Sequence, residues 1–222
     1  MAAEGSSPEI KQFAQRFRFF SSDNRLINAA HFFITCFSVA GDDLGQWRAY
    51  ADNGRGFALA FDTLLLEDAF DKAAKSATCG PQTFRLIYSH RKAVRLHAQI
   101  INEKLPIISP RDASPRDVLL PTLLECVTAA LFFKHKAYRN EAEYRFLELH
   151  KADPVPEARH RTRPDGRSVR YREFNWRSNA PSALKKIVVG PAADAQLAME
   201  WLRAHHRGPP VKVIGSPIPY CP

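Results

Sequence analysis

The spacing of hydrophobic positions predicts a chain that mixes helices with strands. Short apolar or β-branched runs, typical of strands, lie at residues 31–38, 57–61, 84–88, 142–149, 186–190 and 211–214. Helical spacing of apolar positions predicts helices at residues 9–20, 63–77, 89–104, 122–138 and 191–206. This alternation predicts an α+β protein with a central mixed β-sheet flanked by helices, and the run at 31–38 is dense enough to be a buried strand.

A chain of this length suits one hydrophobic core, so we expect a single domain over residues 1–222. The pattern divides it into an N-terminal helical segment at 9–30, a core at 33–150, an arginine-rich hairpin or loop at 152–181, and a C-terminal β-α-β unit at 184–215. The segment 106–121 carries four prolines without periodicity, which predicts a loop.

Two short stretches carry polar groups at informative positions. Asp42 and Asp43 precede a short helix that contains Trp47 and Tyr50, and an acidic N-cap suits that start. The stretch 52–56 has Asn-Gly at its centre, which predicts a tight turn into the strand at 57–61.

Charge adds a preference for anions. The sequence has 32 Lys and Arg against 23 Asp and Glu, a formal charge of +9 that attracts phosphates of a nucleotide or a nucleic acid. A generally basic composition explains the same number without a ligand. No apolar run approaches a membrane span and the N-terminus lacks a signal peptide, so we expect a cytoplasmic protein with no membrane partner.

The four cysteines predict neither a zinc site nor a disulfide. They are scattered, with no C-x-x-C pair, and no third ligand accompanies the histidines at a useful spacing. Cys36 and Cys126 lie in apolar stretches, where we expect them to be small core residues. We therefore expect no metal.

Three segments form a recognisable series. They are Cys36-Phe37-Ser38 with the following Trp47 to Phe57 and Phe61-Asp62, then Asn140-Glu141-Ala142-Glu143-Tyr144-Arg145, then Lys186 to Gly190. In this order they resemble a bacterial family known as domain of unknown function 2971, over Phe33 to Gly190. Members usually open with a His-Tyr-Thr-like strand and an Asn-Asp-Pro motif, and Met1 to Ile34 contains neither.

The family pattern is similar to ADP-ribosyltransferase-like folds, and this resemblance implies a use for several residues. The substrate would be NAD, Glu143 or else Glu141 would be the catalytic carboxylate, and Tyr50 would stack on nicotinamide. The other residues expected to bind the cofactor are Trp47, Arg145, Ser38, Gly54 and Gly56, of which Arg145 would steer the pyrophosphate and the glycine amides would bind a phosphate. A role in bacterial defence or as a toxin is a further expectation from the same analogy.

The residues themselves make this chemistry coherent. Strand side chains alternate, so Glu141, Glu143 and Arg145 are expected on one face, opposite Tyr144 and Phe146. A carboxylate beside the ribose can stabilise the oxocarbenium-like centre formed when nicotinamide leaves. The interpretation requires Tyr50 and Glu143 to face one pocket.

A purely structural interpretation stays open for each of these groups. The acidic and basic side chains at 141–145 form a solvated strand face with cross-strand ion pairs in that interpretation. Trp47 and Tyr50 then serve as core anchors, and the glycines at 54 and 56 belong only to a turn.

A rival function is a non-catalytic nucleic-acid-binding module. The segment 159–177 interleaves arginines with Val169, Tyr171 and Phe174, and such mixing suits single-stranded nucleic acid. The arginines assigned to this role are Arg163, Arg167, Arg170 and Arg172. A solvated basic hairpin is the alternative, and an inactive, shortened homologue is a third interpretation because the His-x-Thr-like strand is missing.

Overall fold

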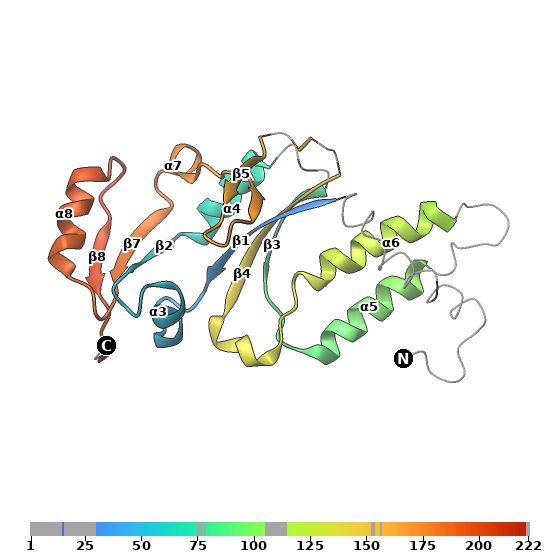
Figure 1. The fold of residues 1–222 in the computed structure, drawn as a ribbon, viewed down its shortest axis with the longest axis horizontal. Coiled ribbons are helices and arrows are strands. Elements are labelled where there is room, and N and C mark those ends of the chain that lie inside the picture. Colours follow the sequence, from blue (N-terminus) through green and yellow to red (C-terminus); the bar gives the residue numbers. More distant parts are fainter. Residues whose placement is uncertain are drawn as a thin grey trace.

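A computed structural model confirms the α+β fold (Figure 1). It describes residues 30–74, 79–104, 115–151 and 157–220, together with the single positions 15, 77, 154 and 155. The helix expected at 9–20 falls outside the described residues except for position 15, and so does nearly all of the segment 9–30.

The first sheet contains the strand that carries the Glu-x-Glu motif. Its order is β1-β4-β3, with antiparallel pairing throughout, and its strands are β1 His31–Ser38, β4 Glu143–His150 and β3 Cys79–Arg85. β1 pairs with β4 along its whole length, from His31 opposite His150 to Ser38 opposite Glu143. The central strand β4 is therefore held from both sides.

The remaining strands form a second sheet and a hairpin. The second sheet, of order β2-β7-β8, consists of β2 Phe57–Phe61, β7 Leu184–Val189 and β8 Lys212–Gly215. The β7–β8 pair is parallel, as expected for a β-α-β unit, whereas β2 runs antiparallel to β7. The hairpin expected within residues 152–181 is made of β5 Arg159–Thr162 and β6 Ser168–Tyr171, with its turn at Pro164-Asp165-Gly166.

The helices begin where short acidic side chains can cap them. Asp43, Asp62 and Asp194 each accept a hydrogen bond from a first-turn amide. The helices are α3 Leu44–Tyr50, α4 Thr63–Ala73, α5 His90–Lys104, α6 Pro115–Ala130, the 3-10 helix η2 Lys136–Glu141, α7 Trp176–Asn179 and α8 Ala195–His205. Within the described part of the chain, none of them is long and apolar enough to span a membrane.

Several expected boundaries were wrong. The loop expected at 106–121 gives way at Pro115 to α6, because proline is tolerated in a first helical turn, and Pro121 lies inside this helix. The helix expected at 122–138 ends at Ala130, and the helix expected from residue 191 begins only after its Asp194 cap. The strand expected at 84–88 lies earlier, as β3. The short helix α7 was not predicted.

The burial expected for β1 was also wrong. Ile34, Thr35 and Cys36 are exposed, since β1 is an edge strand of its sheet among the described residues. Cys36 is therefore not a core residue, whereas Cys126 is buried as expected.

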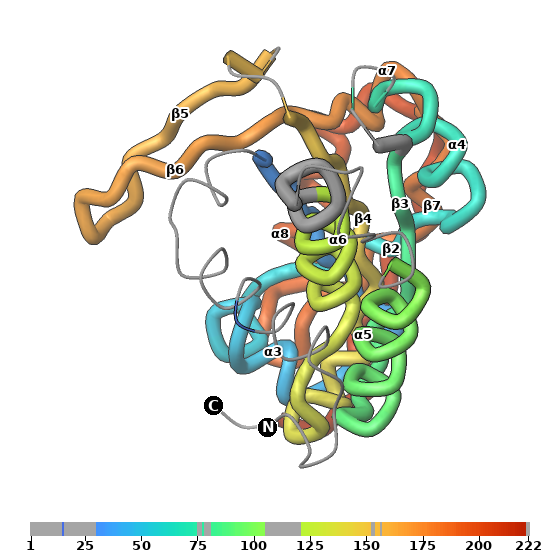
Figure 2. The backbone as a smooth tube through the Cα atoms, turned by 90° about the vertical axis from the view of Figure 1, so that its right-hand side faces the viewer, coloured from blue at the N-terminus to red at the C-terminus, as the bar shows by residue number. Residues whose placement is uncertain are grey.

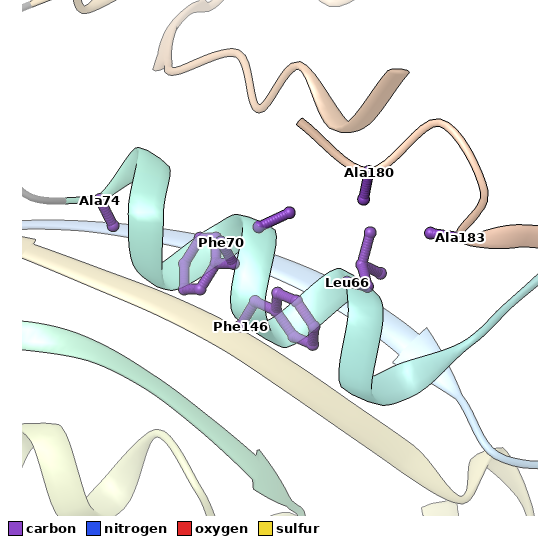
Figure 3. Packing of buried hydrophobic residues seen from close by; sticks show 7 residues of the cluster. Leu66, Phe70, Ala74, Phe146, Ala180 and Ala183 are labelled. Atoms are coloured by element: carbon purple, nitrogen blue, oxygen red, sulfur yellow. The ribbon is translucent and has the colours of Figure 1, made fainter. Parts of the chain in front are cut away.

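The core lies between α4 and one face of the first sheet (Figure 3). Phe70 of α4 packs against Phe146 of β4 with ring centroids 4.9 Å apart, and Leu66 lies beside them. Ala180 and Ala183 close the cluster from the segment before β7. Because Phe146 faces α4, the alternation along β4 turns Glu143 and Arg145 to the opposite face.

Candidate functional site

The two acidic residues around the start of β4 lie close together. η2 ends at Glu141, and Ala142 adopts a left-handed conformation (φ 44°) before β4 begins at Glu143. The ammonium of Lys134 donates to both carboxylates, at 3.1 Å to Glu143 Oε2. Lys134 thus brings the two carboxylates together, but Glu141 lies on η2 and not on the strand of Glu143, so their expected place on one strand face was wrong.

Arg145 completes this group, termed the carboxylate cluster (Lys134, Glu141, Glu143 and Arg145). Its Nε donates to Glu143 Oε1 at 2.7 Å and its Nη2 to Oε2 at 3.2 Å, so one guanidinium contacts both oxygens. Its Nη1 donates to the backbone carbonyl of Leu131, just beyond α6. The cluster therefore joins β4 to the segment between α6 and η2.

Glu143 is held in its ionised form although its side chain is only 7% exposed. Burial alone raises the pKa of this carboxyl, but hydrogen bonds from Arg145, Cys36 and Lys134 outweigh burial and lower the pKa to about 2. For Lys134, burial lowers the pKa, and the bonds to Glu141 and Glu143 more than offset this and raise it. Glu143 is consequently negative at physiological pH and cannot donate a proton there.

The thiol of Cys36 lies against the same carboxylate. Desolvation of the sulfur, followed by the hydrogen bond to Glu143, raises the pKa of Cys36 to about 11, so the thiol stays protonated and donates. Cys36 stands opposite Arg145 in the β1–β4 pairing. Sequence reasoning missed this contact because it depends on the register between two strands far apart in the chain.

A cavity of about 560 Å³ adjoins the carboxylate cluster. No acidic residue lines it, and the side chains that give it its character are Tyr88, Ser89, His90, Lys134, His135 and Lys136. Tyr88 Oη accepts a hydrogen bond from the backbone N–H of Glu143 at 2.9 Å, and Lys134 is shared with the cluster. α5 begins here at His90, and a helix N-terminus adds partial positive charge. This basic cavity has the charge that a phosphate group requires.

Trp47 and Tyr50 do not join the carboxylate cluster. Trp47 is 4% exposed and its Nε1 donates to Asp42 Oδ1 at 2.5 Å, so it anchors α3 in the core. Tyr50, at the end of α3, is 73% exposed. A further cavity, of about 500 Å³, lies between the two sheets and is lined by residues that include Phe61, Tyr144 and Val188. Tyr50 lines neither this cavity nor the basic cavity, so in neither of them does the structure bring Tyr50 and Glu143 together.

The amides of Gly54 and Gly56 serve the turn. Gly54 N–H donates to the carbonyls of Trp47 and Ala51, at 3.1 and 2.9 Å, and Gly56 N–H donates to Ala51 at 3.0 Å. Gly54 has φ 84° and packs against Gly190, where an added Cβ would collide with the Gly54 carbonyl. With both amides occupied, the expectation that they bind a phosphate was wrong, and the turn interpretation holds.

Ser38 positions the turn that carries Glu141. Its Oγ donates to the Glu141 carbonyl at 2.8 Å and accepts from Gln46 Nε2 at 2.7 Å and Ala40 N–H at 3.0 Å. It lines the cavity between the two sheets, which also includes Tyr144 and lies on the face of β4 opposite Glu143. Ser38 stands opposite Glu143 in the β1–β4 pairing and supports the cluster through the backbone carbonyl of Glu141.

The arginines of the hairpin are split between surface and interior. Arg163 and Arg167 are exposed and both pair with Asp165 in the turn. Arg170 Nη1 lies 3.3 Å from His31 Nδ1. The side chain of Arg172 is only 7% exposed. The expectation that Arg172 contacts a nucleic acid was therefore wrong, because its guanidinium is enclosed.

The buried side chains of Glu148 and His150 resemble a pair of metal ligands, but their partner is Arg172. Arg172 Nη1 contacts Glu148 and His150 Nε2, the latter at 2.8 Å, and His150 lies 3.0 Å from Glu148 Oε2. The guanidinium thus occupies the place between them. In the part of the chain that the structure describes, no three His, Cys, Asp or Glu side chains are arranged to hold a metal ion.

With this geometry established, residues 46–146 match the model of a known family. It is described as "Protein of unknown function (DUF2971)". The DUF2971 match covers most of α3, the Gly54 turn, the basic cavity and the Glu-x-Glu motif, and it supports the family resemblance of the first two segments. The stretches Cys36–Ser38 and Lys186–Gly190 lie outside it. No curated protein and no solved structure matches the chain.

Proposed function

We propose that the chain is an NAD-dependent enzyme that cleaves the bond between nicotinamide and ribose, as an ADP-ribosyltransferase or an NAD glycohydrolase. The observation that carries the proposal is the ionised, nearly buried Glu143, paired with Glu141 beside a basic cavity. NAD combines a ribose that becomes positive during cleavage with a negative pyrophosphate. A carboxylate next to a cationic cavity complements both parts.

The chemistry requires a fixed negative charge more than a proton donor. Cleavage leaves positive charge on C1′ and the ring oxygen of the ribose, and nicotinamide departs with the bonding electron pair. Glu143 is ionised at physiological pH and can stabilise that charge. Water or a hydroxyl of a target then bonds to C1′ and loses its proton, which Glu141 or solvent accepts.

One oxygen of Glu143 is better placed to meet a ribose hydroxyl. Oε1 receives the shortest bond, 2.7 Å from Arg145 Nε, whereas the bonds to Oε2 from Lys134 and Arg145 measure 3.1 and 3.2 Å. We expect the ribose to share Oε2, while Lys134 turns to the pyrophosphate in the basic cavity. Tyr88 is the tyrosine that lines this cavity, so we assign the stacking role to Tyr88 in place of the exposed Tyr50.

The proposal is tested by measuring nicotinamide release from NAD by chromatography. Glu143→Gln keeps the shape of the side chain and removes the charge, so we expect release to fall by about 100-fold or more. Glu173→Gln is the matched control, since Glu173 forms only a surface ion pair with Arg159. Release by folded Glu143→Gln at the wild-type rate would contradict the proposal, as would folded wild type that releases no nicotinamide with any protein or nucleic-acid target.

A second candidate function is nucleic-acid binding by the hairpin. Figure 2 shows β5 and β6 as an arm that extends away from the rest of the chain. Every residue of β5 is exposed, and Arg159, Arg161, Arg163 and Arg167 contribute positive charge to the arm. An exposed two-stranded ribbon of this kind has the width and the charge to follow a nucleic-acid backbone.

Binding of a labelled single-stranded oligonucleotide at increasing salt tests this candidate. We expect the affinity to fall steeply with salt, and the triple variant Arg161→Glu, Arg163→Glu, Arg167→Glu to lose binding. Arg91→Glu on α5 is the control, because it changes charge away from the arm. Binding that is insensitive to salt, or equal in the triple variant and the wild type, would contradict it.

A further inference from the structure

A second cationic cavity lies at the other end of the molecule, away from the carboxylate cluster. It has a volume of about 540 Å³ and is bordered by α7, β7 and α8, at the end of the chain drawn on the left of Figure 1. Leu184 and Ile187 of β7 give it a buried apolar floor. Its volume is in the range of small-molecule sites. It shares no residue with the basic cavity or the carboxylate cluster.

Two tryptophans give this cavity, termed the tryptophan cavity, flat aromatic walls. Trp176 is fixed edge-on against Phe61, with ring centroids 4.9 Å apart and planes at 79°. Trp201 of α8 stacks on His205 with centroids 4.8 Å apart and planes at 19°. Trp201 remains 56% exposed, so an indole surface is available for another planar ring.

The charge of the tryptophan cavity is positive. Arg177, Arg207, His205 and His206 line it, and no acidic residue does. The Arg177 guanidinium lies 5.2 Å from the centroid of Trp176, which orients it beside the aromatic wall. Among the described residues neither Arg177 nor Arg207 forms an ion pair, so their charges are not neutralised by the protein.

We infer that the tryptophan cavity binds a nucleoside phosphate, with the base on Trp201 and the phosphate between Arg177 and Arg207. An aromatic ring linked to a phosphate matches both features, since indole stacks on any base and guanidinium is suited to phosphate. A purely apolar ligand would leave the two arginines without partners. A free nucleotide and one nucleotide unit of a single-stranded nucleic acid both offer this chemistry.

The tryptophans supply a direct readout. The chain has three, and Trp47 is buried in the core, so quenching on ligand addition reports Trp176 and Trp201. Titration with AMP is expected to quench the fluorescence to saturation, and Trp201→Phe is expected to remove most of that change. Calorimetry then gives the affinity of variants without relying on the fluorophore.

Charge variants test the assignment of the phosphate. We expect Arg177→Gln with Arg207→Gln to weaken AMP binding by about tenfold or more, and adenosine to bind wild type correspondingly weakly. Arg203→Gln on α8, the helix that carries Trp201, does not alter the cavity lining and is expected to leave the affinity unchanged. Thermal unfolding checks that each variant is folded. Equal AMP affinity in the double variant and wild type would overturn the inference.

Titration with an oligoadenylate shows whether the cavity takes a free nucleotide or one unit of a single-stranded nucleic acid. Tighter binding than AMP, lost in the double variant, assigns the cavity to a strand, and equal or weaker binding assigns it to a free nucleotide. Glu143→Gln is expected to leave AMP binding unchanged, because it lies in a different site. If neither AMP nor the oligonucleotide quenches to saturation, or if Glu143→Gln abolishes AMP binding, the inference fails whatever the outcome of the NAD-cleavage test.

Discussion

At the scale of single residues, partners decide what an acidic group can do. Glu143 and Glu148 lie on the same strand and each is 7% exposed. Glu143 shares Lys134 with a basic cavity and is therefore next to a space that a ligand can enter. Glu148 is bonded to the buried His150 and Arg172, and it serves to hold the base of the hairpin.

The lowered pKa of Glu143 predicts a specific response to acid. Because its folded pKa is about 2 against an ordinary 4.5, its ionisation stabilises the fold above about pH 5, and this contribution disappears as the pH falls towards 2. The difference is worth at most about 3 kcal/mol. Urea unfolding at several pH values should show Glu143→Gln less stable than wild type at neutral pH, with the gap closing towards pH 2. A gap that does not change with pH would contradict this.

The raised pKa of Cys36 predicts low reactivity at an exposed position. A shift from 9.0 to about 11 leaves roughly one hundredth of the ordinary thiolate, and only the thiolate is alkylated. Peptide mapping after iodoacetamide treatment at about pH 8 should find Cys36 modified slowly in the folded protein and faster in Glu143→Gln. Alkylation of wild-type Cys36 as fast as that of an unfolded control would show that the thiol is not held by Glu143.

At the scale of elements, the sequence predicted strands, caps and turns from local patterns, but it did not predict contacts between segments far apart in the chain. The strands at 31–38 and 57–61, the Asp43 cap and the hairpin turn follow from short patterns, and the structure has all of them. The contacts of Lys134 with the two glutamates were not predicted, because the helix was expected to continue to Tyr138. Its end at Ala130 is what frees Lys134 to reach Glu141 and Glu143.

The packing of α4 on the first sheet predicts where stability resides. Phe146 is 2% exposed and contacts Phe70, so Phe146→Ala should lower the free energy of unfolding by about 3–5 kcal/mol. Phe57→Ala is the control, since Phe57 is 49% exposed. Chemical denaturation measures both. Similar losses in the two variants would contradict the placement of the core.

At the scale of the whole molecule, a chain with a net charge of +9 presents three separate surfaces that carry basic side chains. They are the basic cavity, the hairpin arm and the tryptophan cavity, which come from different parts of the chain. Composition predicted the attraction for anions but not this division. Nor did it predict the division within the hairpin, where Arg172 turns inward while Arg163 and Arg167 stay on the arm.

This division predicts that the arm and its anchor behave differently. Arg172→Met leaves Glu148 with a buried charge and no guanidinium, so the protein should lose about 3–5 kcal/mol of stability. Arg167→Met removes only an exposed pair with Asp165 and should leave the stability nearly unchanged. Thermal or urea unfolding distinguishes them, and equal effects would contradict an inward Arg172.

The central claim, that NAD binds beside Glu143, is tested most directly by calorimetric titration of NAD into the folded protein. We predict saturable binding that weakens by about tenfold in Lys136→Gln, which removes one cation of the basic cavity, and is unchanged in Lys212→Gln on β8. Absence of binding by folded wild type, or equal affinity in Lys136→Gln and wild type, would contradict the claim.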